Sequence, residues 1–280
     1  MQQRFPDERM RFFLGDVRDG ERLKRAFDRV DVVIHAAALK QVPAAEYNPF
    51  ECIKTNVMGA QNVIDAAISA GVERAIALST DKAASPVNLY GASKLCSDKL
   101  FISGNAYSTG HGPRLAVVRY GNVVGSRGSV VPLFRRLART GRLPITDPRM
   151  TRFLITIQQG VRFVLECLHR MRGGELFVPK IPSADIMTIA EAVAPGCERE
   201  IVGIRNGEKL HELMITEDDS RHTMDLDAFY MITPQFSWWD DGTYVGGKGV
   251  PEGFSYRSDT NPHRLTVEEV RDLVGPMQAA

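Results

Sequence analysis

The chain has 280 residues, of which 44% are hydrophobic and 25% charged, and its 35 Lys plus Arg against 34 Asp plus Glu give a formal net charge of +1. These values are ordinary for a globular protein and allow one large domain or a domain and a half. They exclude a global field that favours nucleic acid or an anionic membrane, and no apolar run approaches the roughly 18 residues of a membrane-spanning helix.

The first part of the chain alternates short apolar runs with helical patterns. The pattern predicts strands over residues 10–15, 31–38, 74–80 and 114–122, and helices over residues 18–29, 48–70 and 89–107. Each strand is an almost continuous apolar run, and the longest helix repeats its apolar residues at spacings of three and four. This alternation predicts an α/β fold with a Rossmann-type, doubly wound parallel sheet covered on both faces.

After about Gly125 the pattern becomes irregular. It predicts helices over residues 130–140, 158–171 and 266–274, short strands over 176–179 and 199–205, and loops from Ala228 until the last helix. We therefore expect two domains. Residues 1–125 would form a partial NAD(P)-binding Rossmann domain, and residues 126–280 mainly a smaller α+β lobe that binds substrate.

The start of the chain departs from a complete dinucleotide-binding fold. Such a fold opens with a strand, a Gly-rich turn and a helix that holds the pyrophosphate at its N-terminus. No GxGxxG precedes Asp16, and only nine residues precede Met10. We expect a sheet that lacks its first β-α-β segment, which would leave the strands over 10–15 and 31–38 without hydrogen-bond partners. The alternative is a complete protein of another α/β design that begins at Met1.

The cysteines indicate no disulfide bond, and the histidines indicate no metal centre. Cys52, Cys96, Cys167 and Cys197 show neither disulfide-framework density nor CxxC spacing, and the N-terminus lacks the apolar core of a secretory signal. We therefore expect free thiols and a cytoplasmic location. The six histidines have no metal-ligand spacing, so we expect no metal site.

Tyr90 and Lys94 form a Tyr-x-x-x-Lys pair, which places both side chains on one helix face. A tyrosine with a pKa near 10 is a poor base at neutral pH, and an adjacent ammonium favours its phenolate. The same lysine can hold a nicotinamide ribose. Because the pair opens a helix soon after a strand that ends in Ser79–Thr80, we interpret it as a hydride-transfer site rather than a surface pair.

Asp81 and Lys82 follow that strand directly. Ligands bind beyond the carboxyl ends of strands in parallel sheets, so the pair can face the same substrate as Tyr90. A carboxyl group can protonate a leaving hydroxyl, and a lysine whose pKa is lowered by burial can remove a carbon-bound proton. Position alone leaves an exposed charge pair in a turn equally open.

Other polar residues carry weaker signals. Asp16 after a strand can bind the adenine end of a cofactor or simply form a turn, and the small residues 36–38 allow either close approach of a cofactor or helix–sheet packing. Arginine pairs bidentately with phosphate, so scattered cations of the second half make a diphosphate substrate plausible. These cations are Arg127, Arg152, Arg205 and Lys209.

Six segments extend these observations to a family. They read HAAALKQVPAAEYNPFECIKTNVMGAQNVIDAA, LSTDKAASPVNLYGASKLCSDKLF, VVRYGNVVGSRGSVVPLF, ITDPRMTRF, GGELFVPKIPS and GIRNGEKLHE. From about Arg9 to the C-terminus the chain closely resembles inverting UDP-N-acetylglucosamine 4,6-dehydratases, which are extended short-chain dehydrogenases that start pseudaminic acid synthesis for flagellin glycosylation. Thr80-Asp81-Lys82 separates it from similar deoxythymidine-diphospho-glucose dehydratases, which carry Thr-Asp-Glu.

The resemblance implies a role for each site residue. Tyr90 takes the proton of the C4 hydroxyl while hydride passes to NADP rather than NAD, with Lys94 supporting both and Thr80 bonding the C4 oxygen. Lys82 removes the C5 proton, Asp81 helps the C6 hydroxyl leave as water, and hydride returns to C6. Further cofactor contacts are implied at Asp16, Val17, Ala36, Tyr120 and Gly121. Contacts to the substrate or its diphosphate are implied at Lys40, Asn122, Arg127, Arg152, Arg205 and Glu208.

The implied partner is UDP-N-acetylglucosamine, handled by a homo-oligomer with no nucleic-acid or membrane partner. The cofactor's preference rests on resemblance alone, because the Gly-rich turn and the strand that selects its 2′-phosphate are not found. Asn206 replaces a usual proline, and Arg264 replaces a usual aromatic residue. Two alternatives stay open: a dehydratase-epimerase of capsule or O-antigen synthesis, and a catalytically inactive, N-terminally truncated remnant.

Overall fold

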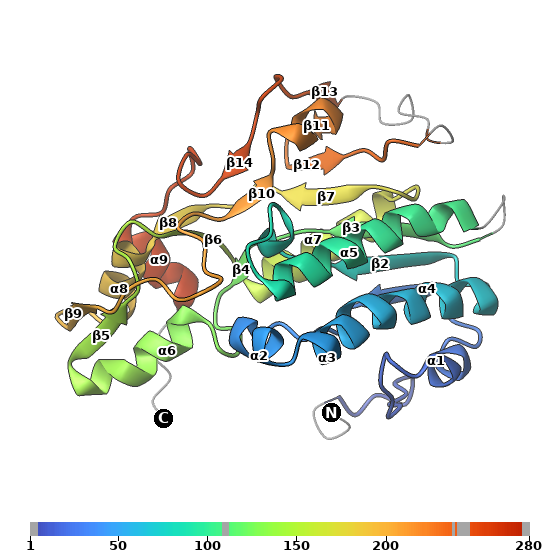
Figure 1. The fold of residues 1–280 in the computed structure, drawn as a ribbon, viewed down its shortest axis with the longest axis horizontal. Helices are drawn as coiled ribbons and strands as arrows, with labels where there is room; N and C mark the ends of the chain where they lie inside the picture. The colour runs from blue at the N-terminus through green and yellow to red at the C-terminus, as the bar shows by residue number, and fades with distance from the viewer. Residues whose placement is uncertain (1–4, 108–111, 237–238, 240–246, 276–280) are drawn as a thin grey trace.

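The computed structural model describes residues 5–107, 112–236, 239 and 247–275. Its largest element is a seven-stranded sheet in the order β1-β2-β3-β7-β12-β11-β13 (Figure 1). The first four strands are parallel, and the remaining three are antiparallel to their neighbours. The parallel part confirms the predicted Rossmann-type sheet, and three antiparallel strands extend it. In sheet order the strands are Val32–His35, Arg74–Leu78, Arg114–Val118, Leu176–Pro179, Phe229–Ile232, Thr223–Asp225 and Lys248–Gly249.

Helices cover both faces of the parallel part, as predicted. α4 (Gly59–Ala70) and α5 (Leu89–Gly104) pack on one face, and α7 (Ile157–Arg170) packs on the other. The strands alternate between the two cores: Leu115 and Val117 of β3 face α4 and α5, whereas Ala116 and Val118 face α7. This two-residue period explains why both faces of each strand are apolar.

The predicted helix over residues 48–70 is confirmed as an almost continuous rod. It consists of α3 (Pro49–Ile53), a π-helical turn (Lys54–Met58) and α4, and it follows the short α2 (Val42–Tyr47) (Figure 1). Pro49 suits the first helical turn because its missing N–H has no helical partner there. Gly71 ends the rod with φ 71°, a left-handed conformation that glycine adopts without a steric cost.

The N-terminal part differs from the prediction. Residues 10–15 form no strand, and Leu14 is 93% exposed. Strand propensity alone does not order a segment that has no pairing partner, and none of the described strands pairs with this one. α1 (Gly20–Ala26) confirms a helix within residues 18–29. β1 stands at the edge of the sheet, where Val32 and Ile34 are 44% and 46% exposed.

A second unit packs beside the C-terminal ends of the parallel strands. Its core gathers Val131, Phe134, Ile189 and Val270. Its strands form the groups β4-β6-β8 and β5-β9. Its elements are β4 (Asn122–Val123), α6 (Val130–Leu137), β5 (Arg142–Ile145), β6 (Thr151–Ile155), β8 (Ser183–Asp185), α8 (Ile186–Val193), β9 (Glu198–Ile201) and α9 (Val267–Val274). The strand pair β10 (Leu213–Ile215) and β14 (Tyr256–Arg257) instead packs into the core of the main sheet, where Met214, Ile215 and Tyr256 are buried.

The predicted helices after residue 125 are confirmed, but the loops predicted from Ala228 are partly wrong. β12 pairs antiparallel with β7, and its Phe229 and Met231 are buried against α7. Within the predicted loops, residues 237–238 and 240–246 lie outside the described residues. The chain after residue 125 therefore contributes strands to both units. The division into domains at residue 125 stays a prediction.

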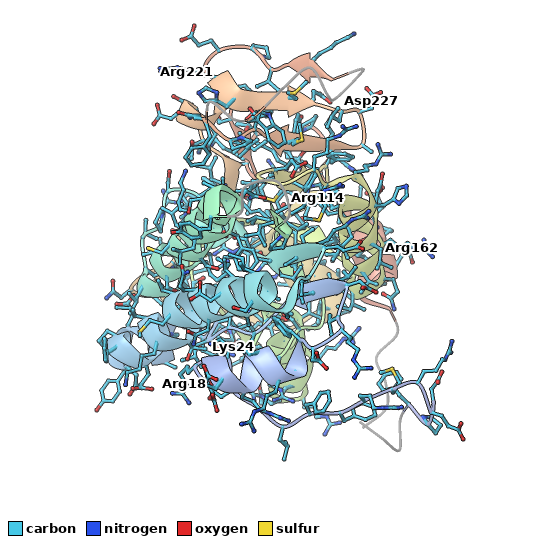
Figure 2. The ribbon with its side chains drawn as sticks, turned by 90° about the vertical axis from the view of Figure 1, so that its right-hand side faces the viewer. Arg18, Lys24, Arg114, Arg162, Arg221 and Asp227 are labelled. Carbon is cyan, nitrogen blue, oxygen red and sulfur yellow. The ribbon has the colours of Figure 1, made fainter. Side chains whose placement is uncertain are left out.

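The two edge strands of the sheet, β1 and β13, lie toward opposite ends of the molecule (Figure 1). Figure 2 shows Arg18 and Lys24 near α1 at one end, and Arg221 and Asp227 around the antiparallel strands at the other. None of the described helices is both long and apolar enough to cross a membrane. Short 3-10 turns complete the described elements: η2 (Asp81–Ala83), η3 (Asn105–Tyr107), η4 (Ala138–Thr140) and η5 (Asp218–His222).

Candidate active site

The turn after β2 packs tightly against the first turn of α5. Thr80 caps the 3-10 turn η2 by accepting a hydrogen bond from the backbone N–H of Lys82, and Asn88 caps α5 in the same way through Gly91. A Cβ atom at Gly91 would lie 2.2 Å from the carbonyl oxygen of Lys82. Only glycine allows this approach, which brings Lys82 beside the helix that carries Tyr90.

Lys82 is held between two buried carboxylates. Its Nζ lies 3.1 Å from Asp81 Oδ1 and 3.0 Å from Glu212 Oε1. Asp81 also accepts a hydrogen bond of 2.9 Å from the Thr80 hydroxyl, and Arg152 Nε lies 3.6 Å from Glu212 Oε1. Asp81 and Glu212 are 1% and 2% exposed. Charges so placed interact strongly because little water screens them.

The three groups of this cluster have shifted pKa values. Burial and the charge of Glu212 raise the pKa of Asp81. Burial raises the pKa of Glu212, but Lys82 and Arg152 outweigh it and bring the pKa below its usual value. Burial lowers the pKa of Lys82, but Asp81 and Glu212 outweigh it and raise the pKa above its usual value. The predicted lowering of the Lys82 pKa by burial is therefore wrong, because two carboxylates bind the ammonium.

Tyr90 and Lys94 lie one turn apart on α5, as predicted. Burial raises the pKa of Tyr90 to about 12, although the charge of Lys82 and a hydrogen bond with Thr80 act in the opposite direction. Lys82 is therefore an ammonium that favours the Tyr90 phenolate, and the same effect expected of Lys94 stays a prediction. Lys94 is 2% exposed, and burial lowers its pKa, with Asp98 opposing.

A cavity of about 340 Å³ joins these groups. Five predicted catalytic residues line it: Thr80, Asp81, Lys82, Tyr90 and Lys94. The predicted cofactor contacts Ala36, Tyr120 and Gly121 line it too. Asp16 and Val17 do not: Arg18 binds the Asp16 carboxylate at 2.7 Å and holds its pKa at about 2, and Val17 packs beside Gly59 at the start of α4.

The residues of this cavity fit the nicotinamide end of a dinucleotide. Lys94 is 2% exposed, forms no hydrogen bond or ion pair with any described residue, and lines the cavity beside Tyr90. Asn122 Oδ1 is also buried without a protein partner among the described residues. Buried polar groups need partners, so a ligand with hydroxyl and amide groups suits this space.

A second cavity of about 270 Å³ adjoins the first. Both are lined by Lys40, Lys82 and Asn122, so they form two halves of one site. Of the other predicted substrate residues, Arg152, Arg205 and Glu208 line the second cavity, and Arg127 lines the first. The structure therefore brings all six together from segments far apart in the chain.

Sequence reasoning missed one residue that lines the site, Glu212, and one that supports it from outside the two cavities, Asn56. Glu212 lines the second cavity and binds Lys82, and its only sequence signal was the motif GIRNGEKLHE. Asn56 is 1% exposed in the π-helical turn. Its amide donates to Ser93 Oγ and to the carbonyl of Leu39, at 2.9 Å each, and thereby ties α5 to the loop after β1.

Comparison with known sequences gives a consistent family. The family of polysaccharide biosynthesis proteins matches residues 1–234. An inverting UDP-N-acetylglucosamine 4,6-dehydratase of Campylobacter jejuni is 56% identical over 95% of this chain and 82% of its own length. A UDP-glucose 4-epimerase of Rickettsia canadensis is 41% identical over 95% of this chain and 80% of its own length.

Solved structures agree with these sequences. Pen from Bacillus thuringiensis superposes with a TM-score of 0.88 and 35% identity over 98% of this chain and 84% of its own. DesIV of Streptomyces venezuelae, a dTDP-glucose 4,6-dehydratase with NAD bound, superposes with a TM-score of 0.67 and 26% identity over 74% and 71%. The fold, the site and these similarities place the chain in the polysaccharide biosynthesis protein family, among the inverting UDP-N-acetylglucosamine 4,6-dehydratases.

Proposed function

We propose that the chain removes water from C5 and C6 of UDP-N-acetylglucosamine with inversion at C5, using a nicotinamide cofactor. The product would be a UDP-2-acetamido-2,6-dideoxy-L-arabino-hexos-4-ulose. One observation carries the proposal: the Asp81–Lys82 turn and the Tyr90–Lys94 pair line the same cavity. The first pair suits acid–base elimination and the second suits hydride transfer, so a single sugar can meet both.

The oxidation at C4 uses the residues of α5. Tyr90 takes the proton of the C4 hydroxyl, and the nearby Lys82 charge makes the phenolate more accessible than burial alone allows. Thr80, which is hydrogen-bonded to Asp81, orients the C4 oxygen. The dinucleotide is held by Tyr90, Lys94, Tyr120, Gly121 and Ala36. The chemistry supplied by the bound cofactor is hydride transfer, first from C4 and later to C6. A proton delivered to the opposite face of C5 completes the reduction and inverts that carbon.

The elimination uses the turn after β2. A keto group at C4 acidifies the C5 proton, which Lys82 removes in its neutral form. Asp81 gives a proton to the C6 hydroxyl, which leaves as water. Burial and the charge of Glu212 raise the pKa of Asp81, so this carboxyl is suited to act as the acid. The sugar and its diphosphate are bound by Lys40, Asn122, Arg127, Arg152, Arg205 and Glu208.

Four finer points belong to the same proposal. NADP serves in preference to NAD, the product enters pseudaminic acid synthesis for flagellin glycosylation, residues 126–280 mainly bind substrate, and the active form is a homo-oligomer. Rates with NADP and NAD at equal concentration test the first point. Sedimentation equilibrium tests the last.

The decisive experiment is mass spectrometry of UDP-N-acetylglucosamine incubated with the chain and NADP. Loss of one water is the expected result, and NMR coupling constants of the product report the configuration at C5. Retention at C5 would contradict the inverting activity. A change of configuration at C4 without loss of water would contradict the dehydratase and favour a 4-epimerase, the activity of the Rickettsia relative.

A further inference from the structure

Glu212 reaches the reactive lysine from the second unit of the molecule. We propose that Glu212 is the positioning residue of the site, which fixes Lys82 in its charged form between two carboxylates and thereby sets the starting protonation state of the Asp81–Lys82 pair. The electrostatic part stands on the structure alone, and its consequence for catalysis rests on the proposed function. Glu212 contacts Lys82 at 3.0 Å across 130 positions of sequence.

The backbone holds Glu212 in place. Its N–H donates to Ser258 Oγ at 2.9 Å, and the N–H of Ser258 donates to the Glu212 carbonyl at 2.9 Å. Ser258 is fully buried, and its hydroxyl lies 2.6 Å from that of Thr151. Glu212 Oε2 has no hydrogen-bond partner among the described residues. The Glu212 carboxylate therefore binds Lys82, and Arg152 makes a second, longer contact with it.

Charged and titratable groups face Lys82 from four directions. Asp81 lies on the same turn, Tyr90 on α5, Arg152 on β6, and Lys209 with Glu212 on the segment before β10. Arg152 lowers the pKa of Lys82, whereas Asp81 and Glu212 raise it. Because the two carboxylates prevail, the resting form of Lys82 is the ammonium. Removing Glu212 deletes one of the two groups that keep it so.

The reactive form then needs only one internal step. A proton moves from Lys82 Nζ to Asp81 Oδ1, so an N–H bond breaks and an O–H bond forms across the 3.1 Å contact. The products are a neutral amine, which can take the C5 proton, and a carboxylic acid, which can protonate the leaving hydroxyl. The total charge of the pair is unchanged, and no outside proton donor is required. The negative charge of Glu212 opposes this step by stabilising the ammonium.

The test measures the titration of Lys82 directly in the full chain. Lysine is labelled at Cε with carbon-13, and Lys82→Met identifies the Lys82 signal. In Glu212→Gln the Lys82 midpoint should fall by about 1–3 pH units, the usual effect of an opposite charge at this distance. Glu208→Gln is the matched control: it removes a carboxylate from the same cavity that bonds the backbone of Arg205 and not Lys82. Identical midpoints in Glu212→Gln and the unaltered chain would overturn the proposal.

A catalytic readout separates positioning from mere stability. The reactive form holds the same number of protons as the resting ion pair, so the rate of water loss should fall at high pH, where the pair loses its proton. In Glu212→Gln this fall should move to lower pH by the same amount as the NMR midpoint. A moved midpoint with an unmoved rate profile would overturn the catalytic part. If the unaltered chain releases no water, the proposed function fails while the NMR comparison still decides the role of Glu212.

A second variant covers the case in which Glu212→Gln does not fold. Glu212→Asp keeps the charge but withdraws it by one methylene, so the Lys82 midpoint should fall in the same direction by a smaller amount. A midpoint equal to that of the unaltered chain in this variant would also overturn the proposal.

Discussion

Lys82 and Lys94 line the same cavity but have opposite electrostatic surroundings. Lys82 binds Asp81 and Glu212, whose charges outweigh burial and raise its pKa. Lys94 binds no described carboxylate, and burial lowers its pKa despite the charge of Asp98. Two identical side chains thus start from different proton affinities, because the second unit supplies an anion to only one of them. The placement of carboxylates, and not the residue type, separates the two roles.

The largest effect should come from removing each lysine. Lys82→Met and Lys94→Met should both slow water loss by about 10²–10⁴-fold, the usual contribution of a positioned acid–base group. Lys94→Met should also slow the oxidation at C4 strongly, because Lys94 holds the cofactor. Lys82→Met should slow this step less, because Lys82 acts on it only through its charge beside Tyr90. Single-turnover absorbance of the reduced nicotinamide measures the oxidation, and mass spectrometry measures water loss.

Lys99→Met is the matched control for these variants, because Lys99 is exposed on the same helix and lines neither half of the site. It should keep both steps. Equal loss of C4 oxidation in Lys82→Met and Lys94→Met would mean that the two lysines do not divide the reaction as proposed.

Arg119 binds Asp98, the carboxylate whose charge opposes the lowering of the Lys94 pKa, so a change at Arg119 alters the surroundings of Lys94. This arginine binds Asp98 at 3.2 Å, and the two residues are 3% and 1% exposed. Arg119→Met leaves the Asp98 carboxylate buried without its ion-pair partner, although the Ser79 hydroxyl still donates to it. This loss should lower the free energy of unfolding by about 3–5 kcal/mol. Urea denaturation measures the loss. The double variant Asp98→Leu/Arg119→Met removes both charges and should recover most of it, whereas a double variant as unstable as the single one would point to lost packing.

His35 reports on the charge of Lys94. It is 4% exposed, and burial together with the Lys94 charge lowers its pKa to about 4 from 6.5. Between these values the unfolded chain binds more protons than the folded one, so stability is full above pH 6.5 and is lost as pH falls toward 4. The loss should reach about 3 kcal/mol.

Urea midpoints measured between pH 7 and pH 4 test this sign. His35→Gln should flatten the profile, and Lys94→Met should flatten it in part because the pKa of His35 rises when the nearby charge is removed. His169→Gln, at an exposed position on α7, should leave it unchanged. Parallel profiles for His35→Gln and the unaltered chain would contradict the account.

The sequence predicts the local parts of the site well. Tyr90 and Lys94 share a face because helical spacing requires it, and Asp81 and Lys82 follow a strand whose apolar run marks its end. Glu212 is not predictable by the same reasoning. It meets Lys82 only after the second unit folds against the first, and no spacing along the chain specifies a contact across 130 positions. The pKa of Lys82 was misjudged for the same reason.

The same difference between local and long-range contacts decided which elements of the fold were predicted. The helices that were predicted are confirmed, because their patterns and caps are local, as at Thr156 before α7 and Thr266 before α9. The short helices α2 and α8 were missed. Strands depend on partners. The apolar segment over residues 10–15 has none among the described strands and is irregular, whereas residues 229–232 were assigned to a loop and form β12 beside β7. Pairing between distant segments decided both cases.

The smallest expected effect concerns the contact that places both lysines at one site. Gly91→Ala puts a methyl group 2.2 Å from the Lys82 carbonyl oxygen, so the turn must shift away from α5. We expect the free energy of unfolding to fall by about 1–3 kcal/mol, together with slower water loss. Gly160→Ala on α7 is the control, since its nearest neighbour would be 4.0 Å away and alanine favours a helix. A Gly91→Ala variant as stable and active as the unaltered chain would mean that the turn can move away from α5 without cost. The position of Lys82 in the same cavity as Lys94 would then depend on Glu212 rather than on this contact.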